Sequence, residues 1–301
     1  MLSPLLHVGI LLVSFIGLCF GTSSGSTFPR YQLEALEALY NSTNGDHWAW
    51  RVNNSNVSHH NSVPLLLGKE LPDQHNVHIG VPWNFTANAN PCVDKWQGIL
   101  CNGTGVCDEL NAWNCNVTDI TLIRHNLTGT IPSELYTITT LEGLDFSDNN
   151  LYGTIPSGLG LLSSLTHLAF AKNHIVGSFP TSMFDCRSLR SIVTEYNALT
   201  GPLPVQLGTL SSLSALGVGF NSFFGTLPSS LGMLSKLHWL DVQQNCFSGT
   251  IPASIGYLTD VTGLDCGANH FTGSFPSAVS GVPNSLLVVV SAPSAVLHRI
   301  L

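Results

Sequence analysis

The chain has 301 residues, a formal net charge of −8 at pH 7 and only 9% charged residues, whereas hydrophobic residues make up 44%. Binding to nucleic acid needs a basic surface that neutralises phosphates, and a chain with 10 lysines and arginines against 18 acidic residues lacks one. Composition therefore argues against nucleic acid as a partner and is compatible with a partner outside the cell.

Residues 1–21 are predicted to be a secretory signal peptide. Leu5 to Phe20 form an apolar run, and the small residues Cys19 and Gly21 suit cleavage before Thr22. An uncleaved signal anchor is the alternative, because no lysine or arginine precedes the run. The run is short for a membrane span, and no later stretch approaches the ~20 apolar residues that a transmembrane helix needs. We therefore expect a secreted or cell-surface protein with no transmembrane helix beyond the signal segment.

Seven acceptor sites for N-glycosylation, of the form N-x-(S/T), agree with that location. All lie in the N-terminal half of the chain, at Asn41, Asn53, Asn56, Asn84, Asn102, Asn116 and Asn126. Because so short a motif also arises by chance, we expect only part of them to carry sugar. Sugars at these sites would shield the N-terminal end and leave most of the later surface bare.

Residues 22–116 are predicted to form an N-terminal cap. Pro29 to Tyr40 indicate its helix, because proline suits the first turn and Leu33, Leu36 and Leu39 lie at helical spacing. Residues 51–82 are a polar insertion that carries four histidines, His59, His60, His75 and His78. Their spacing matches no zinc ligand frame, so we expect a solvated, glycosylated loop and no metal site.

From residue 117 to residue 284 a 24-residue unit recurs seven times. Each copy holds glycine, any residue, an apolar residue and proline, beginning at Gly129, Gly153, Gly177, Gly201, Gly225, Gly249 and Gly273. A ladder of asparagines has the same period, at Asn149, Asn173, Asn197, Asn221, Asn245 and Asn269. A fixed period of this length indicates a solenoid, in which each turn completes its core with its neighbours.

The spacing gives each position of the unit a structural role. In the third repeat Leu168 and Phe170 alternate as in a short strand, while Gly177 and Pro180 set the following turn. The ladder asparagine is polar yet points inward, where an unpaired amide would cost ~1–3 kcal/mol. We therefore expect each asparagine to bond the backbone of the adjacent turn, and we expect nothing on the ladder to be catalytic.

The full unit, L-x-x-L-x-L-x-x-N-x-L-x-G-x-(I/L/F)-P-x-x-L-x-x-L, is a leucine-rich repeat. It resembles the plant-specific class of extracellular leucine-rich repeats, which includes receptor-like proteins, receptor-kinase ectodomains and polygalacturonase-inhibiting proteins. Similar repeats occur in protist surface proteins. Over about residues 120–282 the resemblance implies an α/β solenoid: a right-handed superhelix with a short parallel sheet on its concave face, behind a disulfide-bonded N-terminal cap.

Two strings in the cap, LEALYNSTNGDHW and PCVDKWQGILC, also resemble that class. In the family a cysteine pair and a tryptophan close the hydrophobic end of the solenoid, and the matching residues here are Cys92, Cys101 and Trp96. Cys107 and Cys115 could form a second bridge, and the local pairing 92–101 with 107–115 is the simplest of three. In a secreted chain such bridges persist and stabilise by ~2–4 kcal/mol each.

Three further cysteines and the end of the chain complete the pattern. Cys186 and Cys266 take inward repeat positions and should be buried thiols, whereas Cys246 follows the ladder asparagine and should be more exposed. Beyond Pro276 the period fails, residues 286–290 are expected to add a last strand, and residues 285–301 form a degenerate end. The paired cysteines of the plant-type C-terminal cap are absent there, and an exposed apolar end would favour dimerisation, an unusual cap or a truncated chain.

The outward positions of the strand segments line the concave face and supply the candidate binding site. Aromatic residues without a core role often anchor interfaces, and three of them fall on successive turns beside acidic residues. We predict this aromatic and acidic patch as the ligand-binding surface. Its residues are His167, Lys172, Glu195, Tyr196, Phe220, Trp239 and Asp241.

Catalysis receives little support from the sequence, which has no H-E-x-x-H, G-x-S-x-G or phosphate loop. Glu142 and Asp145 could face one another, but we expect them to be solvated and to lack the burial that tunes acid–base pairs. We expect no cofactor. The favoured function is recognition of an extracellular protein, peptide or polysaccharide in a receptor-like or co-receptor role. The alternatives are an inhibitor of an extracellular cell-wall hydrolase and a structural surface coat or adhesion antigen.

Overall fold

The computed structural model describes residues 28–50, 80–86, 88–102, 107 and 115–276, and the backbone of residues 287–289. Several expectations fall outside these residues. They are the signal peptide, the four histidines of the insertion, the acceptor sites Asn53 and Asn56, and the degenerate end with its role in dimerisation.

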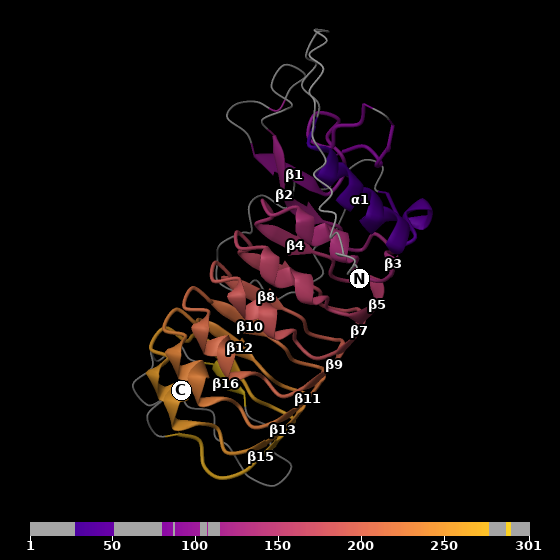
Figure 1. The fold of residues 1–301 in the computed structure, drawn as a ribbon. Coiled ribbons are helices and arrows are strands. Elements are labelled where there is room, and N and C mark those ends of the chain that lie inside the picture. The colour runs from indigo at the N-terminus through magenta and orange to yellow at the C-terminus, as the bar shows by residue number, and fades with distance from the viewer. Residues whose placement is uncertain are drawn as a thin grey trace, which may run out of the picture.

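Nine short strands lie side by side along one face and form the concave sheet (Figure 1). Each repeat pairs in parallel with the next at an interval of 24 residues, so that Leu144 aligns with Leu168 and Leu216 with Leu240. The strand β1 comes from the cap and runs antiparallel to β2. In order across the sheet the strands are β1 (Ile99–Asn102), β2 (Asn116–Thr121), β4 (Gly143–Asp145), β6 (His167–Ala169), β8 (Ser191–Val193), β10 (Ala215–Gly217), β12 (Trp239–Asp241), β14 (Gly263–Asp265) and β16 (Leu287–Val289). The expected last strand is thus present as β16.

A second parallel sheet of seven strands runs along another face of the solenoid (Figure 1). Each strand ends at or near the glycine of its repeat, and most of these glycines have φ between 74° and 92°, a region that side chains other than glycine rarely adopt. The strands are β3 (Thr128–Gly129), β5 (Asn150–Thr154), β7 (His174–Gly177), β9 (Ala198–Gly201), β11 (Ser222–Gly225), β13 (Cys246–Gly249) and β15 (His270–Phe271).

A one-turn 3₁₀ helix follows the proline of each of six repeats and closes the coil. The proline precedes the turn with an extended backbone, and its fixed φ suits that position. The turns cover residues 133–137, 157–161, 181–185, 205–209, 229–233 and 253–257. Inward leucines from the sheets and turns, such as Leu168, Leu216 and Leu240, are fully buried. They join one continuous core with the cap, and truncating one to alanine would cost ~2–5 kcal/mol.

The ladder asparagines point inward and join neighbouring turns. The Asn221 carbonyl oxygen accepts the Leu199 backbone N–H at 2.9 Å, and its amide donates to the backbone oxygens of Thr194, Val218 and Gly219 at 2.9–3.1 Å. The other five repeat this pattern. Each amide therefore satisfies backbone groups of its own turn and of the turns before it, which is why a polar residue is stable at a core position.

The cap begins with the helix α1 (Arg30–Ser42), which lies against the first turns of the solenoid (Figure 1). Leu36 and Leu39 are fully buried as predicted, but Leu33 is only partly buried. Gln32 is buried instead: its side chain accepts the Val117 backbone N–H at 2.9 Å and donates to Asn116 Oδ1 at 2.8 Å. Gln32 therefore takes the place on the buried face that was expected for Leu33, and its polar side chain bonds the start of β2.

Aromatic rings fill the space between α1 and the first repeat. Trp48 packs edge-on against Trp83 with ring centroids 4.9 Å apart, and Trp83 stacks on Trp96 at 5.5 Å. The indole N–H of Trp83 donates to the Gln97 backbone oxygen at 2.9 Å. Val81, at the end of the expected insertion, exchanges backbone hydrogen bonds with Lys95 and Gln97. The cap thus closes the apolar end of the solenoid with rings, as the resemblance implied for Trp96.

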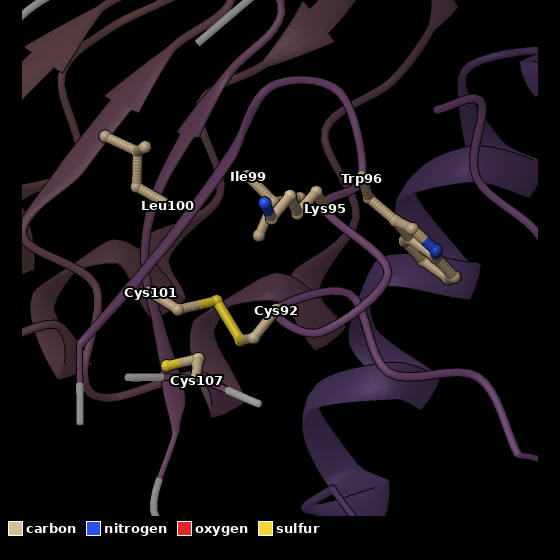
Figure 2. Close-up of a pocket in the computed structure, with 7 residues that line it drawn as sticks. All are labelled: Cys92, Lys95, Trp96, Ile99, Leu100, Cys101 and Cys107. Atoms are coloured by element: carbon tan, nitrogen blue, oxygen red, sulfur yellow. A yellow bond between two sulfur atoms is a disulfide. The ribbon is translucent and has the colours of Figure 1, made fainter. Parts of the chain in front are cut away.

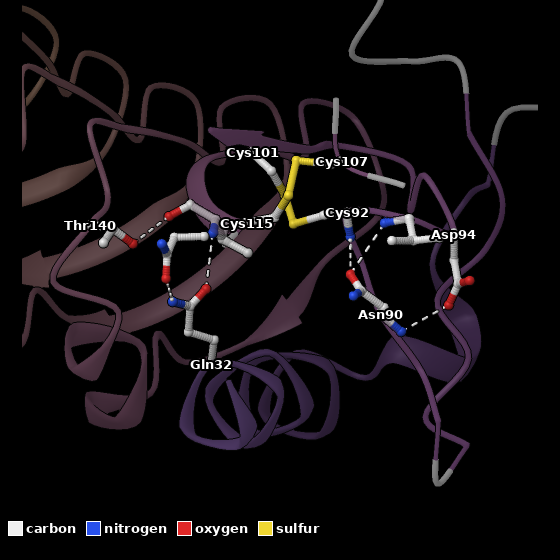
Figure 3. The surroundings of a disulfide bond; sticks show 11 residues. Gln32, Asn90, Cys92, Asp94, Cys101, Cys107, Cys115 and Thr140 are labelled. Carbon is white, nitrogen blue, oxygen red and sulfur yellow. Dashed lines mark hydrogen bonds between the residues drawn. A yellow bond between two sulfur atoms is a disulfide. The ribbon is translucent and has the colours of Figure 1, made fainter. Parts of the chain in front are cut away.

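Two disulfides fasten the same region, Cys92–Cys101 and Cys107–Cys115, which is the local pairing favoured by the sequence. The turn that carries Cys92 is held by Asn90, whose carbonyl oxygen accepts the backbone N–H groups of Cys92 and Val93 at 3.0 and 3.2 Å (Figure 3). Cys186 and Cys266 are buried free thiols and Cys246 is exposed, as expected.

Candidate ligand-binding face

The residue just before the ladder asparagine has a left-handed backbone in every repeat. Its φ lies between 49° and 60°, and the row consists of Arg124, Asp148, Lys172, Tyr196, Phe220, Gln244 and Ala268. Such a conformation costs ~1–2 kcal/mol for a residue other than glycine. It turns the carbonyl toward the previous repeat, where the Tyr196 and Phe220 oxygens accept the ladder N–H groups of Asn173 and Asn197 at 3.2 Å. Because the backbone oxygen makes the hydrogen bond between repeats, that bond does not restrict which side chain stands at these positions.

An aromatic stack occupies the middle of this row. The rings of Tyr196 and Phe220 are parallel within 10° and their centroids lie 4.1 Å apart. Tyr196 is 47% exposed, Phe220 is half-buried, and the Lys172 ammonium lies 5.8 Å from the Tyr196 ring centroid. Stacking and the cation–π contact contribute ~0.5–1.5 kcal/mol each, and they hold a flat apolar surface toward solvent.

Trp239 stands at the start of its strand, whereas Tyr196 and Phe220 follow theirs, so it stays a prediction that all three belong to one binding surface. The tryptophan begins β12, five residues before the left-handed row, and no ring contact in the described part of the chain joins it to Tyr196 or Phe220. Its indole covers Gly263 of β14, where a Cβ would overlap the ring. His167 also begins its strand, β6, and burial lowers its pKa. The aromatic residues of the concave sheet therefore lie at two edges. His167 and Trp239 stand at the start of their strands, and Tyr196 and Phe220 stand just after the end of theirs.

Two carboxylates meet over the strand between these edges. Glu195 follows β8 and its carboxylate lies over Gly217 of β10, while Asp241 ends β12 and its carboxylate lies over Gly219. Both side chains are 6% exposed. The Asp241 oxygens accept the Gln243 backbone N–H at 2.9 Å and its side-chain N–H at 3.1 Å, whereas Glu195 Oε2 is buried with no hydrogen-bond partner.

Burial shifts the protonation of these acids. It raises the pKa of Glu195 to about 7, and the nearby charge of Asp241 contributes to the same rise. Burial also raises the pKa of Asp241, against the opposing hydrogen bonds from Gln243. Perturbed acids that meet on an open face are typical of functional sites. Glu195 and Asp241 are therefore close enough to influence one another, in a buried environment that the sequence did not reveal, and their role in binding stays a prediction.

The expectation that Glu142 and Asp145 are both solvated is wrong for Asp145. Asp145 of β4 is half-buried, and burial raises its pKa to about 6 although its carboxylate accepts the Ser147 backbone N–H at 2.9 Å. Its proposed neighbour Glu142 is exposed. Neighbouring strands lie so close together that the side chain of one repeat covers the strand of the next. These acids are therefore shielded from water although the sheet is open. No group of three or more acidic, histidine or cysteine side chains within the described ranges is arranged to hold a metal.

Sequence reasoning missed three positions that the structure makes important. His125 takes the ladder position of the first repeat, where it is fully buried, and its ring nitrogens face the Ile123 oxygen and the Gln97 side chain at 2.9 and 3.2 Å. Counting back 24 residues from Asn149 would have found it. Gly217 and Gly219 make room for Glu195 and Asp241, and the run of small residues in the fifth repeat was the available signal.

The cap carries the acceptor sites and a small open pocket. Asn41, Asn84, Asn102 and Asn126 are exposed, whereas Asn116 is half-buried and bonded to Gln32. The pocket lies beside the first disulfide and is lined by Cys92, Lys95, Trp96, Ile99, Leu100, Cys101 and Cys107 (Figure 2). It holds no convergent set of polar side chains, so the concave sheet remains the stronger candidate for ligand binding.

Comparison with known proteins agrees with the repeats. A family model described as Leucine Rich Repeat matches residues 140–162 and 236–258. No curated protein matches the sequence. Over 68% of its length the chain is 31% identical to the leucine-rich-repeat ectodomain of the Arabidopsis thaliana receptor kinase GASSHO1/SCHENGEN3 in complex with CASPARIAN STRIP INTEGRITY FACTOR 2, with a TM-score of 0.62.

Two further solved ectodomains are similar. Over 54% of its length the chain is 34% identical to the plant peptide hormone receptor RGFR1 in complex with RGF2, with a TM-score of 0.52. Over 68% it is 27% identical to the ectodomain of the Arabidopsis receptor kinase HAESA with a peptide hormone ligand, with a TM-score of 0.54. The matches cover 23%, 26% and 36% of the three receptor chains, so the chain spans well under half of their length.

The cap disulfides and the similarity to ectodomains fit an extracellular location. In the part of the chain that the structure describes, no helix is both long and apolar enough to span a bilayer. The asparagine ladder, the parallel concave sheet, the disulfide-bonded cap and the matches above together identify the chain as a leucine-rich-repeat protein similar to plant receptor-kinase ectodomains.

Proposed function

We propose that the chain is an extracellular recognition protein that binds a peptide or protein partner on its concave sheet, in a receptor-like or co-receptor role. The observation that carries this proposal is the exposed stack of Tyr196 on Phe220 beside Lys172. These side chains take no part in the core or in the bonds between repeats. Aromatic surfaces of that kind are common anchors of interfaces.

The similar structures support a polypeptide ligand. One is a peptide hormone receptor and another is a complex with a peptide hormone ligand, and both exceed 25% identity to this chain. A short parallel sheet has a second feature that suits a peptide: its outward side chains form rows at a constant spacing, which an extended ligand can follow.

The test is capture of a partner by the secreted chain from an array of extracellular proteins, peptides and polysaccharides. A double variant, Tyr196→Ala with Phe220→Ala, and a single variant, Trp239→Ala, separate the two aromatic edges. Selective capture that the double variant loses by about tenfold or more would support the proposal. The control is Tyr257→Ala, a 72% exposed aromatic on a 3₁₀ turn outside the concave sheet.

Other outcomes would favour the alternatives. Suppression of a cell-wall hydrolase at stoichiometric amounts would indicate an inhibitor. Absence of any selective partner, or capture that no concave variant changes, would contradict the proposal and favour a surface coat or adhesion role.

A further inference from the structure

Between residues 215 and 219 the fifth repeat carries no large outward side chain, and Phe220 follows directly in the left-handed row. Its outward residues are Ala215, Gly217 and Gly219, and all three are buried. Glu195 covers this strand from the fourth repeat and Asp241 covers it from the sixth. The two acids therefore converge on one place from opposite sides, although they are distant in sequence.

Within the described ranges, neither acid forms an ion pair with a basic side chain. The ion pairs of the described residues are Arg30–Glu34 and Arg124–Asp148, and both are elsewhere. Lys172 belongs to the left-handed row of the third repeat, and its ammonium lies over the Tyr196 ring. Glu195 is more than nine-tenths buried and its Oε2 has no hydrogen-bond partner, which is costly for a carboxylate.

We propose that Glu195 and Asp241 bind a basic side chain, arginine or lysine, of the polypeptide ligand on the concave sheet. This inference rests on the proposed function and specifies what the ligand must carry. The flexible end of Glu195 turns outward to accept from a guanidinium or ammonium group, which supplies the missing donor and offsets two negative charges at once. The adjacent stack of Tyr196 and Phe220 offers an apolar surface for the aliphatic stem of that residue.

Other occupants fit the place less well. A divalent metal ion needs more oxygen or nitrogen ligands, and the described residues hold no suitable group of three. A neutral polysaccharide could donate a hydrogen bond but would leave both charges uncompensated. The net charge of −8 also favours the approach of a basic ligand over an acidic one.

The binding should depend on pH. Because the pKa of Glu195 is about 7, its carboxylate is protonated in acid and ionised in mild alkali, so affinity for a cation should rise with pH through neutrality. The charge that acts on Glu195 is that of Asp241, which is in turn influenced by Asp265. Burial raises the pKa of both aspartates as well, so the acids reinforce the same direction.

The experiment selects binders from a library of random peptides of about 12 residues on the full secreted chain at about pH 8. Each arginine of the best binder is then replaced by citrulline, which has nearly the same shape without the charge, and each lysine by norleucine. We expect the critical replacement to weaken binding by about tenfold or more in the wild type and by less than about twofold in Glu195→Gln. In the wild type we expect affinity to fall between about pH 8 and about pH 5.5, and in Glu195→Gln to change less.

The controls separate this inference from the proposed function. Glu142→Gln removes an exposed carboxylate elsewhere on the sheet and should behave as the wild type. Asp241→Asn keeps one oxygen that can still accept the Gln243 backbone N–H, so it tests the second charge with part of the local bonding intact. Peptide binders without basic residues, or a replacement that weakens wild type and Glu195→Gln equally, would overturn the inference and leave concave-face recognition standing. Failure to select any peptide would overturn it too, and the array would then decide the proposed function.

Discussion

The ladder asparagines form an inner row inside the solenoid, and the acids Asp145, Glu195 and Asp241 form an outer row on its concave sheet. The two rows differ in their hydrogen bonding. Each ladder asparagine exchanges hydrogen bonds with the backbone on both sides of its amide. Among the concave acids, Glu195 is equally buried but leaves Oε2 unpaired, and its pKa rises to about 7. Burial is therefore similar in the two rows, and the unpaired oxygen is what distinguishes Glu195 from the ladder asparagines.

The largest expected effect comes from breaking the inner row. Asn149 accepts the backbone N–H groups of His125 and Leu127, both at 3.0 Å, and is 8% exposed. Asn149→Leu leaves both donors unpaired, so we expect a loss of about 3 kcal/mol in the free energy of unfolding. Asn221 accepts one such N–H and is half-buried, and Asn221→Leu should cost more than about 1 kcal/mol.

Chemical denaturation of the purified chain measures both losses. Ser222→Ala, an exposed residue directly after Asn221, is the control and should change stability by less than about 0.5 kcal/mol. If Asn149→Leu left the free energy of unfolding nearly unchanged, the inner row would not stabilise the repeats. The two rows would then not differ in their contribution to stability.

The outer row should respond in the opposite direction. The pKa of Glu195 is higher in the folded chain than its ordinary value of 4.5, so the folded state holds the proton more tightly and ionisation destabilises it as pH rises through about 7. Glu195→Gln mimics the protonated form. We therefore expect it to raise stability by about 1–3 kcal/mol above about pH 8 and to change little below about pH 4.5.

Unfolding of wild type, Glu195→Gln and Glu142→Gln across that pH range is the measurement. Glu142 is exposed, so its variant should give no pH-dependent difference. A gain for Glu195→Gln that is the same at every pH would mean that the buried charge is not its source.

A smaller effect should follow from closing the space under Glu195. A Cβ at Gly217 would overlap the end of the Glu195 side chain, which is flexible and can move toward water. Gly217→Ala should therefore cost less than about 1 kcal/mol and lower the pKa of Glu195. In this background the gain from Glu195→Gln above about pH 8 should shrink, and a double-mutant cycle measures the difference. An undiminished gain would contradict the assignment of Gly217 as the floor of the acid pair.

The regular part of this fold was predictable from its period. The inward asparagines, the positive φ of the repeat glycines and the burial or exposure of the three free cysteines each follow from a position in the unit, and the cap tryptophan follows from the resemblance. These positions are dictated by local geometry that every turn repeats. A residue of the right type at the right interval is therefore informative even without its partners.

For the candidate site, the sequence predicted which residues lie on the concave sheet but not which of them touch. The sequence placed Glu195 and Asp241 on the concave sheet, but it could not show that both lie across glycines of the repeat between them. It also joined Trp239 to Tyr196 and Phe220, although the tryptophan begins its strand and the other two follow theirs. Side-chain reach across neighbouring strands decides these contacts, and a one-dimensional pattern contains no such information. Gln32, which replaced Leu33 on the buried face of α1, is missed for the same reason.

The smallest expected effect concerns thiols on the two sides of the repeats. Cys186 and Cys266 lie in the core, where burial raises the pKa of both and brings that of Cys186 to about 11, whereas Cys246 is exposed beside the ladder. Only a thiolate reacts quickly with a maleimide. We therefore expect labelling of the native chain at about pH 8, mapped by peptide mass spectrometry, to reach Cys246 at least about a hundredfold faster than the other two. Cys246→Ser should remove the fast reaction without changing the unfolding midpoint, because an exposed side chain packs against little. Equal labelling of Cys186 in the native chain would mean that the core opens to solvent. The contrast between the paired ladder asparagines and the unpaired Glu195 would then reflect how often each region opens rather than how its polar atoms are bonded.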